Sequence, residues 1–132
     1  MARLYLDSAP VIYTVEQVAP FAVWVDARLA GADVVRVASE LTRLECRIKP
    51  LRTGNAGLLQ DFEDFFSGTV AEMVNFARPV WDRAAAIRSQ YGFRTPDSLH
   101  LAAATVSGCD VFLTNDHRLD RFPDIPIEVV PP

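Results

Sequence analysis

Long apolar runs are missing from this sequence of 132 residues. No stretch reaches the ~18 consecutive apolar residues of a membrane-spanning helix, and residues 1–7 lack the apolar core of a secretory signal peptide. Cysteine is also scarce, since Cys46 and Cys109 are the only two and form no CxxC pair. Two separate thiols are more typical of a reduced cytosolic protein than of a disulfide framework. The sequence therefore predicts a cytoplasmic protein with no membrane interaction.

Lysine and histidine are nearly absent, and this narrows the chemistry. Lys49 is the only lysine beside twelve arginines, and arginine suits bidentate contact with phosphate. The net charge is −4, so a broad basic surface for coating duplex nucleic acid is not indicated. With two histidines in the chain, a Ser-His-Asp triad has no support. The GxGxxG and GxxxxGK(S/T) loops are missing as well, which argues against a nucleotide cofactor.

Strands and helices alternate along the chain. Apolar runs predict strands over residues 3–6, 33–37, 69–74, 110–114 and 126–130. Helical periodicity and cap signals predict a helix that begins at 9–13, further helices over 20–29, 39–49, 58–66, 78–91 and 95–106, and a short one from 115, with Pro50 stopping the third. Because strands joined by helical crossovers pair in parallel, we expect one α/β domain over residues 1–132. It should be a three-layer sandwich, with a mostly parallel sheet of about five strands flanked by helices.

The stretch from Arg94 to Ala104 organises the rest of the chain. Thr95 is a predicted helix cap, Pro96 suits the first helical position, and Asp97 lies in the first turn. The remainder of this helix is small and apolar, so it should be buried. It therefore brings a carboxylate to the end of a core element, and unpaired buried charge is costly.

Four acidic residues are predicted to meet at one edge of the sheet. Asp7 directly follows the first predicted strand, and Asp116 lies two residues after the strand that ends at Thr114. Asp97 begins a helix, and Glu45 projects from the helix that Ser39 caps. The ligand crevice of such sheets lies beyond the carboxyl ends of the strands. Each acid also has an ordinary structural explanation. Asp7 and Asp116 could be turn or cap residues, and Asp97 could simply interact favourably with the helix dipole.

The ordinary explanations of Glu45 are a pair with Lys49, four residues on, and a capping box with Thr42. Four acids at one edge would repel one another, however, so their joint placement favours a divalent cation. Oxygen ligands without a cysteine or histidine cluster favour Mg²⁺ or Mn²⁺ over zinc. We interpret His100, three residues after Asp97, as a packed and hydrogen-bonded residue.

Four blocks of the sequence resemble the PIN-domain ribonucleases, and among them the VapC-type toxins of bacterial toxin–antitoxin pairs. The blocks are Leu4-Tyr5-Leu6-Asp7-Ser8, Ser39-Glu40-Leu41-Thr42-Arg43-Leu44-Glu45, Thr95-Pro96-Asp97-Ser98-Leu99-His100-Leu101-Ala102-Ala103-Ala104 and Leu113-Thr114-Asn115-Asp116-His117-Arg118-Leu119. The third block is the most specific, although the family usually has alanine where Ser98 stands.

The resemblance implies a Mg²⁺-dependent endoribonuclease, with Mn²⁺ as a substitute, that cleaves single-stranded or loop RNA. It implies catalytic acids at Asp7, Glu45, Asp97 and Asp116. Asp7, Asp97 and Asp116 would hold the metal, while Glu45 would bind through water or orient the attacking water. It also implies a homodimer and a small antitoxin protein as partner.

Several alternatives stay open at this point. Glu40 lies in the same block as Glu45 and could be the second acid. The chain could be a PIN scaffold that binds RNA or protein without cutting, although intact acids argue against this. An unrelated acidic α/β phosphotransfer domain would need a second acid beside Asp7 and a lysine on a late strand. Ser8 and Ala9 follow Asp7, and Lys49 is the only lysine, so this alternative is disfavoured.

Overall fold

A parallel sheet of five strands forms the centre of the computed structural model, which describes residues 1–132. The strands are β1 (Ala2–Leu6), β2 (Val34–Ser39), β3 (Glu72–Val74), β4 (Val111–Thr114) and β5 (Ile127–Val129). They lie in the order β3-β2-β1-β4-β5, and every neighbouring pair is parallel. The predicted α/β fold with five strands is confirmed, and the sheet is parallel throughout.

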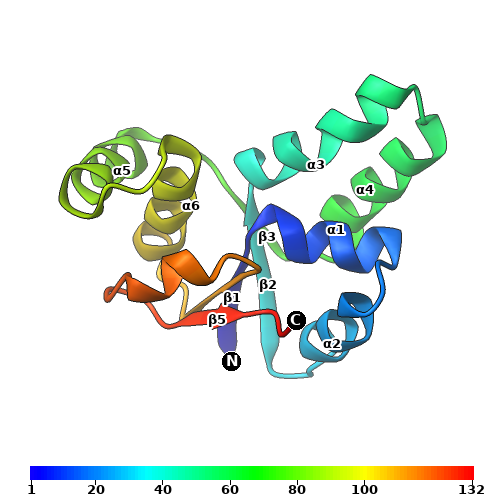
Figure 1. Ribbon diagram of the computed structural model, residues 1–132, viewed down its shortest axis with the longest axis horizontal. Helices are drawn as coiled ribbons and strands as arrows, with labels where there is room; N and C mark the ends of the chain where they lie inside the picture. Colours follow the sequence, from blue (N-terminus) through cyan, green and yellow to red (C-terminus); the bar gives the residue numbers. More distant parts are fainter.

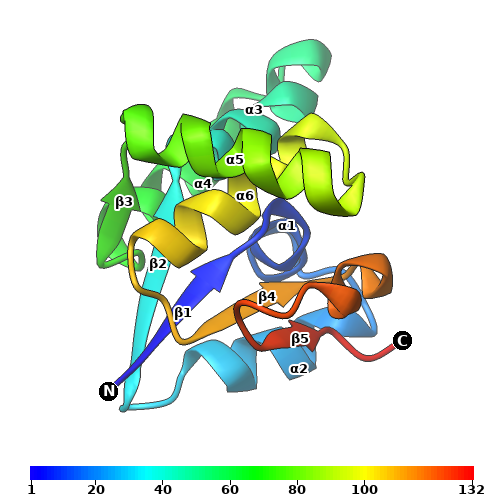
Figure 2. The ribbon, with the colours of Figure 1, turned by 90° about the vertical axis from the view of Figure 1, so that its left-hand side faces the viewer.

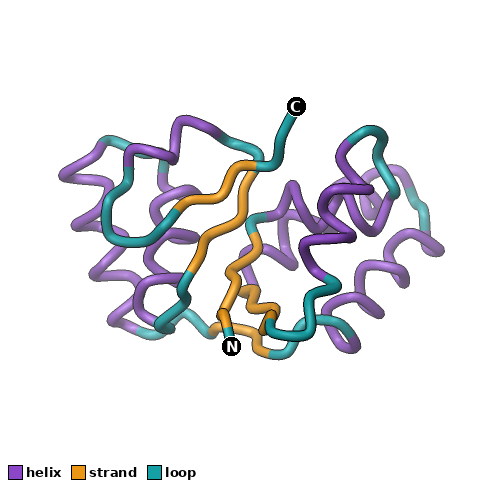
Figure 3. The backbone as a smooth tube through the Cα atoms, turned by 90° about the horizontal axis from the view of Figure 1, so that it is seen from below, coloured by secondary structure: helices purple, strands orange, loops and turns teal.

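Two groups of helices cover the two faces of the sheet (Figure 1). One group holds α1 (Ser8–Glu16), α2 (Phe21–Leu29), α3 (Glu40–Thr53) and α4 (Ala56–Gly68), and the other holds α5 (Arg78–Tyr91) and α6 (Thr95–Val106). A short 3-10 helix, η1 (His117–Arg121), follows β4. Seen from below, the strands run between the two groups (Figure 3), which gives the three layers of the predicted sandwich.

The central strand β1 serves both halves of the core because side chains alternate along a strand. Tyr5 is fully buried in the cluster formed with α5 and α6, where its ring stacks on Phe112 at 5.3 Å between centroids. Leu4 and Leu6 are buried in the opposite cluster, which includes Phe62 of α4. A strand buried on both faces reads as a continuous apolar run, which explains why residues 3–6 carry so clear a signal.

The stop and cap predicted for two helices are wrong, and α4 is longer at both ends than the predicted 58–66. Pro50 does not stop α3, which runs on to Thr53 and ends at Gly54 in the left-handed conformation (φ 66°). Pro50 lies near the end of the helix and is buried there, so the one backbone hydrogen bond that it removes is tolerated. Thr95 does not cap α6, because Arg94 holds that position and Thr95 is the first helical residue.

None of the helices is long and apolar enough to cross a membrane. Cys46 is buried, Cys109 is half-buried, and both are free thiols. Burial raises the pKa of the Cys46 thiol, so this side chain is a packing residue rather than a reactive one.

The carboxyl edge of the sheet brings together segments that are distant in sequence. Strands β2, β1 and β4 are neighbours, and they lead into α3, α1 and the turn before η1 respectively. Figure 2 shows the arrow of β1 running directly into α1. Residues that follow these three strands are therefore placed side by side.

Candidate metal-dependent nuclease site

Asp7 is fixed at the centre of this edge by hydrogen bonds to both of its carboxylate oxygens. The residue caps α1, where Oδ1 accepts a bond from the Ser8 N–H at 2.8 Å. Oδ2 accepts a bond from Thr114 Oγ1 at 2.8 Å, which ties the end of β1 to the end of β4. The side chain is only 13% exposed. The turn and cap explanation of Asp7 is thus correct, and the same geometry holds the carboxylate at the strand ends.

Glu45, and not Glu40, reaches the position beside Asp7. Glu45 Oε1 lies 2.5 Å from His100 Nε2, and the same nitrogen lies 3.5 Å from Asp7 Oδ1. Glu40 is the first residue of α3, its side chain is 56% exposed, and its nearest charged partner is Arg43 at 3.6 Å.

Neither ordinary explanation of Glu45 applies in the structure. Lys49 pairs with Glu16 at 2.8 Å instead. The capping box of α3 is formed by Ser39 and Thr42, without Glu45. Glu45 is therefore free to lie against His100.

His100 connects the acids to the core. Its ring is 1% exposed, and Nδ1 lies 2.8 Å from the Tyr5 hydroxyl, which in turn donates to Ser39 Oγ at 2.8 Å. Burial lowers the pKa of His100, but the hydrogen bond to Glu45 and the charges of Asp7, Glu45 and Asp97 outweigh it, so the pKa is raised overall. A protonated ring here compensates two neighbouring carboxylates.

The packed and hydrogen-bonded interpretation of His100 is correct but incomplete. The structure also places this histidine inside the acidic group, which is therefore not made of oxygen atoms alone. The ligand atoms of Asp7, Glu45 and His100 all lie within 4.8 Å of one another. The signal available in the sequence was the spacing of three residues from Asp97, which puts both side chains on one side of α6.

Asp97 lies in the first turn of α6 with few compensating contacts. Its side chain is 17% exposed, and its ion pair with Arg94 is long, at 3.6 Å. Burial raises the pKa of Asp97, the charges of Asp7 and Asp116 raise it further, and Arg94 and His100 only partly oppose them. The ionised form of Asp97 is therefore disfavoured by burial first and by neighbouring negative charge second.

Asp116 is held by an arginine. It caps η1, and its carboxylate accepts hydrogen bonds from the Arg118 guanidinium at 2.6 and 2.9 Å. The bonds to Arg118 lower the pKa of Asp116. A depression of about 120 Å³ contains Asp97 and Asp116 together with Arg94, Arg118 and Arg121. Arg94, Arg118 and Arg52 are the arginines that the sequence places nearest the predicted crevice, and Arg52 is not among the lining residues.

The donors at this edge fit a hard divalent cation. Asp7, Glu45 and Asp97 offer carboxylate oxygens, which Mg²⁺ and Mn²⁺ prefer. The hydrogen bond between His100 and Glu45 fixes the direction of one carboxylate, as partners behind a metal site commonly do. The raised pKa of Asp97, caused by burial and then by the charges of Asp7 and Asp116, points the same way, because a cation would stabilise the ionised carboxylate.

The family model described as PIN domain matches residues 4–125. The chain therefore belongs to the PIN domain family, and the unrelated phosphotransfer domain is no longer an alternative. No curated protein sequence matches the chain.

Solved structures share the fold at low sequence identity. VapBC2 from Rickettsia felis, bound to a DNA fragment from its promoter, is similar with a TM-score of 0.78 and 15% identity, over 96% of this chain and 98% of that one. A toxin–antitoxin complex from Klebsiella pneumoniae is similar with a TM-score of 0.74 and 19% identity, over 92% of this chain and 94% of that one. FitAcB from Neisseria gonorrhoeae is similar with a TM-score of 0.68 and 19% identity, over 94% of this chain and 95% of that one. At such low sequence identities, these similarities show a shared fold.

Proposed function

We propose that the protein is a metal-dependent endoribonuclease and the toxin of a toxin–antitoxin pair. The observation that carries the proposal is the convergence of Asp7, Glu45 and His100, with Asp97 beside them, at the carboxyl edge of the sheet. Membership in the PIN domain family supports a nuclease. The similar structures named as toxin–antitoxin complexes support the biological role.

Each acid has a distinct proposed role. Asp7 and Asp97 would hold the metal, and Asp116 would join them if Arg118 turned away from it. Glu45, oriented by His100, binds through water or positions the attacking water. A divalent cation, when bound, would supply Lewis-acid stabilisation of the charge that develops on the phosphate.

The surroundings of the acids support an RNA substrate. Arg94, Arg118 and Arg121 line the depression that contains Asp97 and Asp116, and guanidinium groups suit phosphate oxygens. These few arginines are local, while the net charge of the chain is −4. Recognition of single-stranded or loop RNA by shape and stacking needs no broad basic surface.

The direct test is cleavage of a labelled single-stranded RNA by the purified protein. Cleavage should occur with Mg²⁺ or Mn²⁺ and stop when EDTA is added, because the carboxylates alone cannot stabilise the developing charge. Gel analysis of the fragments gives the rate. Full activity in EDTA would reject the metal role, and binding of RNA without cleavage in Mg²⁺ would favour the non-cleaving PIN scaffold.

The proposed partner is a small antitoxin that inserts a basic side chain at the acidic edge, in a complex built on a homodimer of this chain. Exposed apolar residues Leu44, Ile48 and Leu51 recur along one side of α3 and offer a surface for such a dimer. An arginine or lysine beside Asp7 and Asp97 would replace the charge of the metal.

Co-expression with the product of the adjacent small gene should yield a complex that does not cleave RNA. Alanine at every basic residue of the antitoxin tail should restore most of the cleavage activity, since the carboxylates are then exposed again. Light scattering of the purified complex counts the toxin copies. Unchanged inhibition after removal of all these basic residues would contradict the proposed contact, and a single toxin copy would contradict the dimer.

A further inference from the structure

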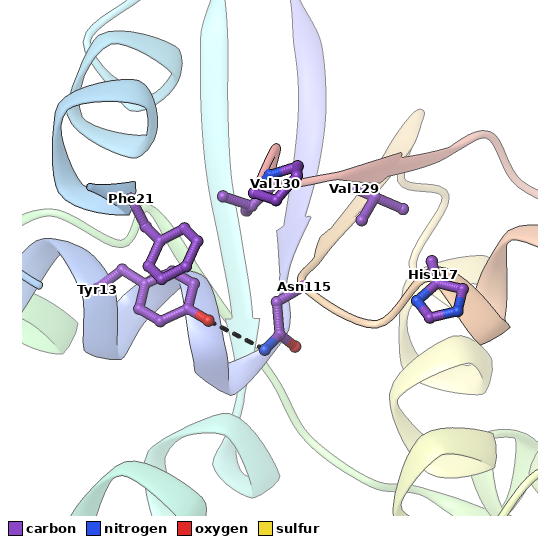
Figure 4. A pocket seen from close by; sticks show the side chains of 7 residues that line it. Tyr13, Phe21, Asn115, His117, Val129 and Val130 are labelled. Atoms are coloured by element: carbon purple, nitrogen blue, oxygen red, sulfur yellow. Dashed lines mark hydrogen bonds between the residues drawn. The ribbon is translucent and has the colours of Figure 1, made fainter. Parts of the chain in front are cut away.

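A cavity of about 440 Å³ opens beside the acidic edge, and none of the arginines of the neighbouring depression lines it. Its walls come from α1, α2, the turn after β4 and the end of β5 (Figure 4). The lining side chains used below are Tyr13, Phe21, Asn115, His117, Val129 and Val130. The volume lies within the range of about 300–1,000 Å³ that is typical of small-ligand sites.

The cavity presents a flat aromatic surface. The rings of Tyr13 and Phe21 stack with centroids 4.5 Å apart and 19° between their planes. Both side chains are only half-buried, and Figure 4 shows them on one side of the cavity, with His117 on the other. Faces of this kind bind bases of single-stranded nucleic acid by stacking, because every base has a π-face.

Asn115 adds hydrogen-bonding capacity between these two walls. Its side-chain amide donates to the Tyr13 hydroxyl at 3.1 Å, which fixes the orientation of the amide. The carbonyl oxygen and the second N–H are left as an acceptor and a donor on an exposed residue. That pairing matches the edges of bases, which carry adjacent donors and acceptors.

The cavity is joined directly to the acidic group. Thr114 Oγ1 donates to Asp7 Oδ2 and accepts from the Asp116 N–H at 3.0 Å, so both chain neighbours of Asn115 belong to the acidic group or are bonded to it. Tyr13 lies six residues after Asp7, which is about 9 Å along the axis of α1. A nucleotide seated in the cavity would therefore lie close to a phosphate held at the acids.

We propose that this cavity binds an unpaired nucleobase of the RNA, next to the phosphodiester bond that is cleaved, and so sets base preference at that position. The inference rests on the proposed nuclease function. None of the lining side chains is acidic, whereas the neighbouring depression contains Asp97 and Asp116. Asn115 and His117 of this cavity flank Asp116, which lines the depression that also holds the arginines. The two hollows therefore border one another, which suits a base in the cavity and backbone phosphates at the arginines.

The first test measures binding without cleavage, in EDTA. AMP, GMP, CMP and UMP are titrated separately into labelled protein, with ribose 5-phosphate as the probe that lacks a base. NMR signals of the Asn115 side-chain amide and the methyl groups of Val129 and Val130 should shift with at least one nucleotide and stay in place with ribose 5-phosphate. Equal shifts with ribose 5-phosphate, or no shift with any nucleotide, would overturn the proposal.

Variants then assign the binding to the aromatic wall and the amide. Tyr13→Leu should weaken nucleotide binding by roughly tenfold, from the loss of one stacking surface. Asn115→Ala, at an exposed residue, should narrow the difference in affinity among the four nucleotides while the fold stays intact. Trp81→Leu removes another exposed aromatic side chain, on α5, and serves as the control with binding like the parent.

Cleavage of RNA libraries gives an independent outcome. Asn115→Ala should flatten the base preference next to the cut site and lower kcat/KM on the preferred sequence by roughly tenfold. If the parent cuts no RNA, the proposed function fails while the nucleotide titration still decides the cavity. If Tyr13→Leu and Asn115→Ala bind nucleotides normally but escape the antitoxin, the cavity is a peptide site and the proposal is wrong.

Discussion

Glu45→Gln should lower the rate of RNA cleavage by at least about 100-fold, the usual scale for loss of a group that handles a proton or positions water in the transition state. The substitution keeps the shape of the side chain but removes its negative charge. Glu45 Oε1 lies 2.5 Å from His100 Nε2, and a neutral amide cannot hold a protonated imidazole or a metal-bound water in the same way.

Glu40→Gln provides a matched control on the same helix. Glu40 is exposed in the first turn of α3, with Arg43 as its charged partner, so its loss should change the rate by no more than about twofold, as for ordinary surface charges. Single-turnover rates under saturating Mg²⁺ make the comparison, and thermal melting verifies that both variants fold. A larger loss for Glu40→Gln than for Glu45→Gln would move the second acid to the start of α3.

The sequence predicts the sheet well because its signals are local. Residues 4–6 and 111–113 form apolar runs within two of the strands, and the helix over 78–91 has the predicted bounds in the structure. The prediction fails at Pro50 and Thr95, where a helix end depends on which backbone groups are buried and bonded. Gly54 ends α3 in place of Pro50. In α6 the Ser98 N–H bonds to the Arg94 carbonyl, so that Arg94 rather than Thr95 becomes the cap.

The acids could be located from the sequence, but their partners could not. Asp7 and Asp116 follow strands, and parallel strands end at one edge. The contact between Glu45 and His100 joins residues 55 positions apart, and the contact between Tyr5 and His100 joins residues 95 apart. Both depend on the close approach of α3, β1 and α6, which no local pattern encodes.

The partners show how the protein tolerates its own acidic site. His100 compensates Asp7 and Glu45, Arg118 holds Asp116, and Arg94 lies at the longer distance of 3.6 Å from Asp97. Arg94 and Arg118 are largely exposed, so they can move away from the acids at little cost. His100 is buried, so it cannot move away from Asp7 and Glu45 in this way. Asp97 is therefore the least compensated acid, and its substitution should report most directly on metal binding.

Asp97→Asn should leave the metal-free protein as stable as the parent or more stable at neutral pH. Burial and the charges of Asp7 and Asp116 raise the pKa of Asp97 above its usual 3.8. A raised pKa means that the folded state disfavours the ionised carboxylate, so the parent loses stability as pH rises from about 4 through the folded-state pKa. The variant lacks this loss. Its advantage in melting temperature should therefore grow over that pH range and persist at pH 7.

Metal titration separates this expectation from a simple interaction between Asp97 and the dipole of α6. At a concentration of about 100 times Kd, Mg²⁺ or Mn²⁺ should stabilise the parent by about 2.7 kcal/mol, which corresponds to roughly 10 °C for a protein of this size. Asp97→Asn should gain far less, because one of the proposed ligands has lost its charge. Asp82→Asn, at an exposed acid of α5, should respond to metal like the parent.

If Asp97 only interacts with the dipole of α6, Asp97→Asn should instead lower the free energy of unfolding by about 0.3–1 kcal/mol in EDTA. The variant should then be stabilised by metal as much as the parent, and Asp97 would be excluded from the site.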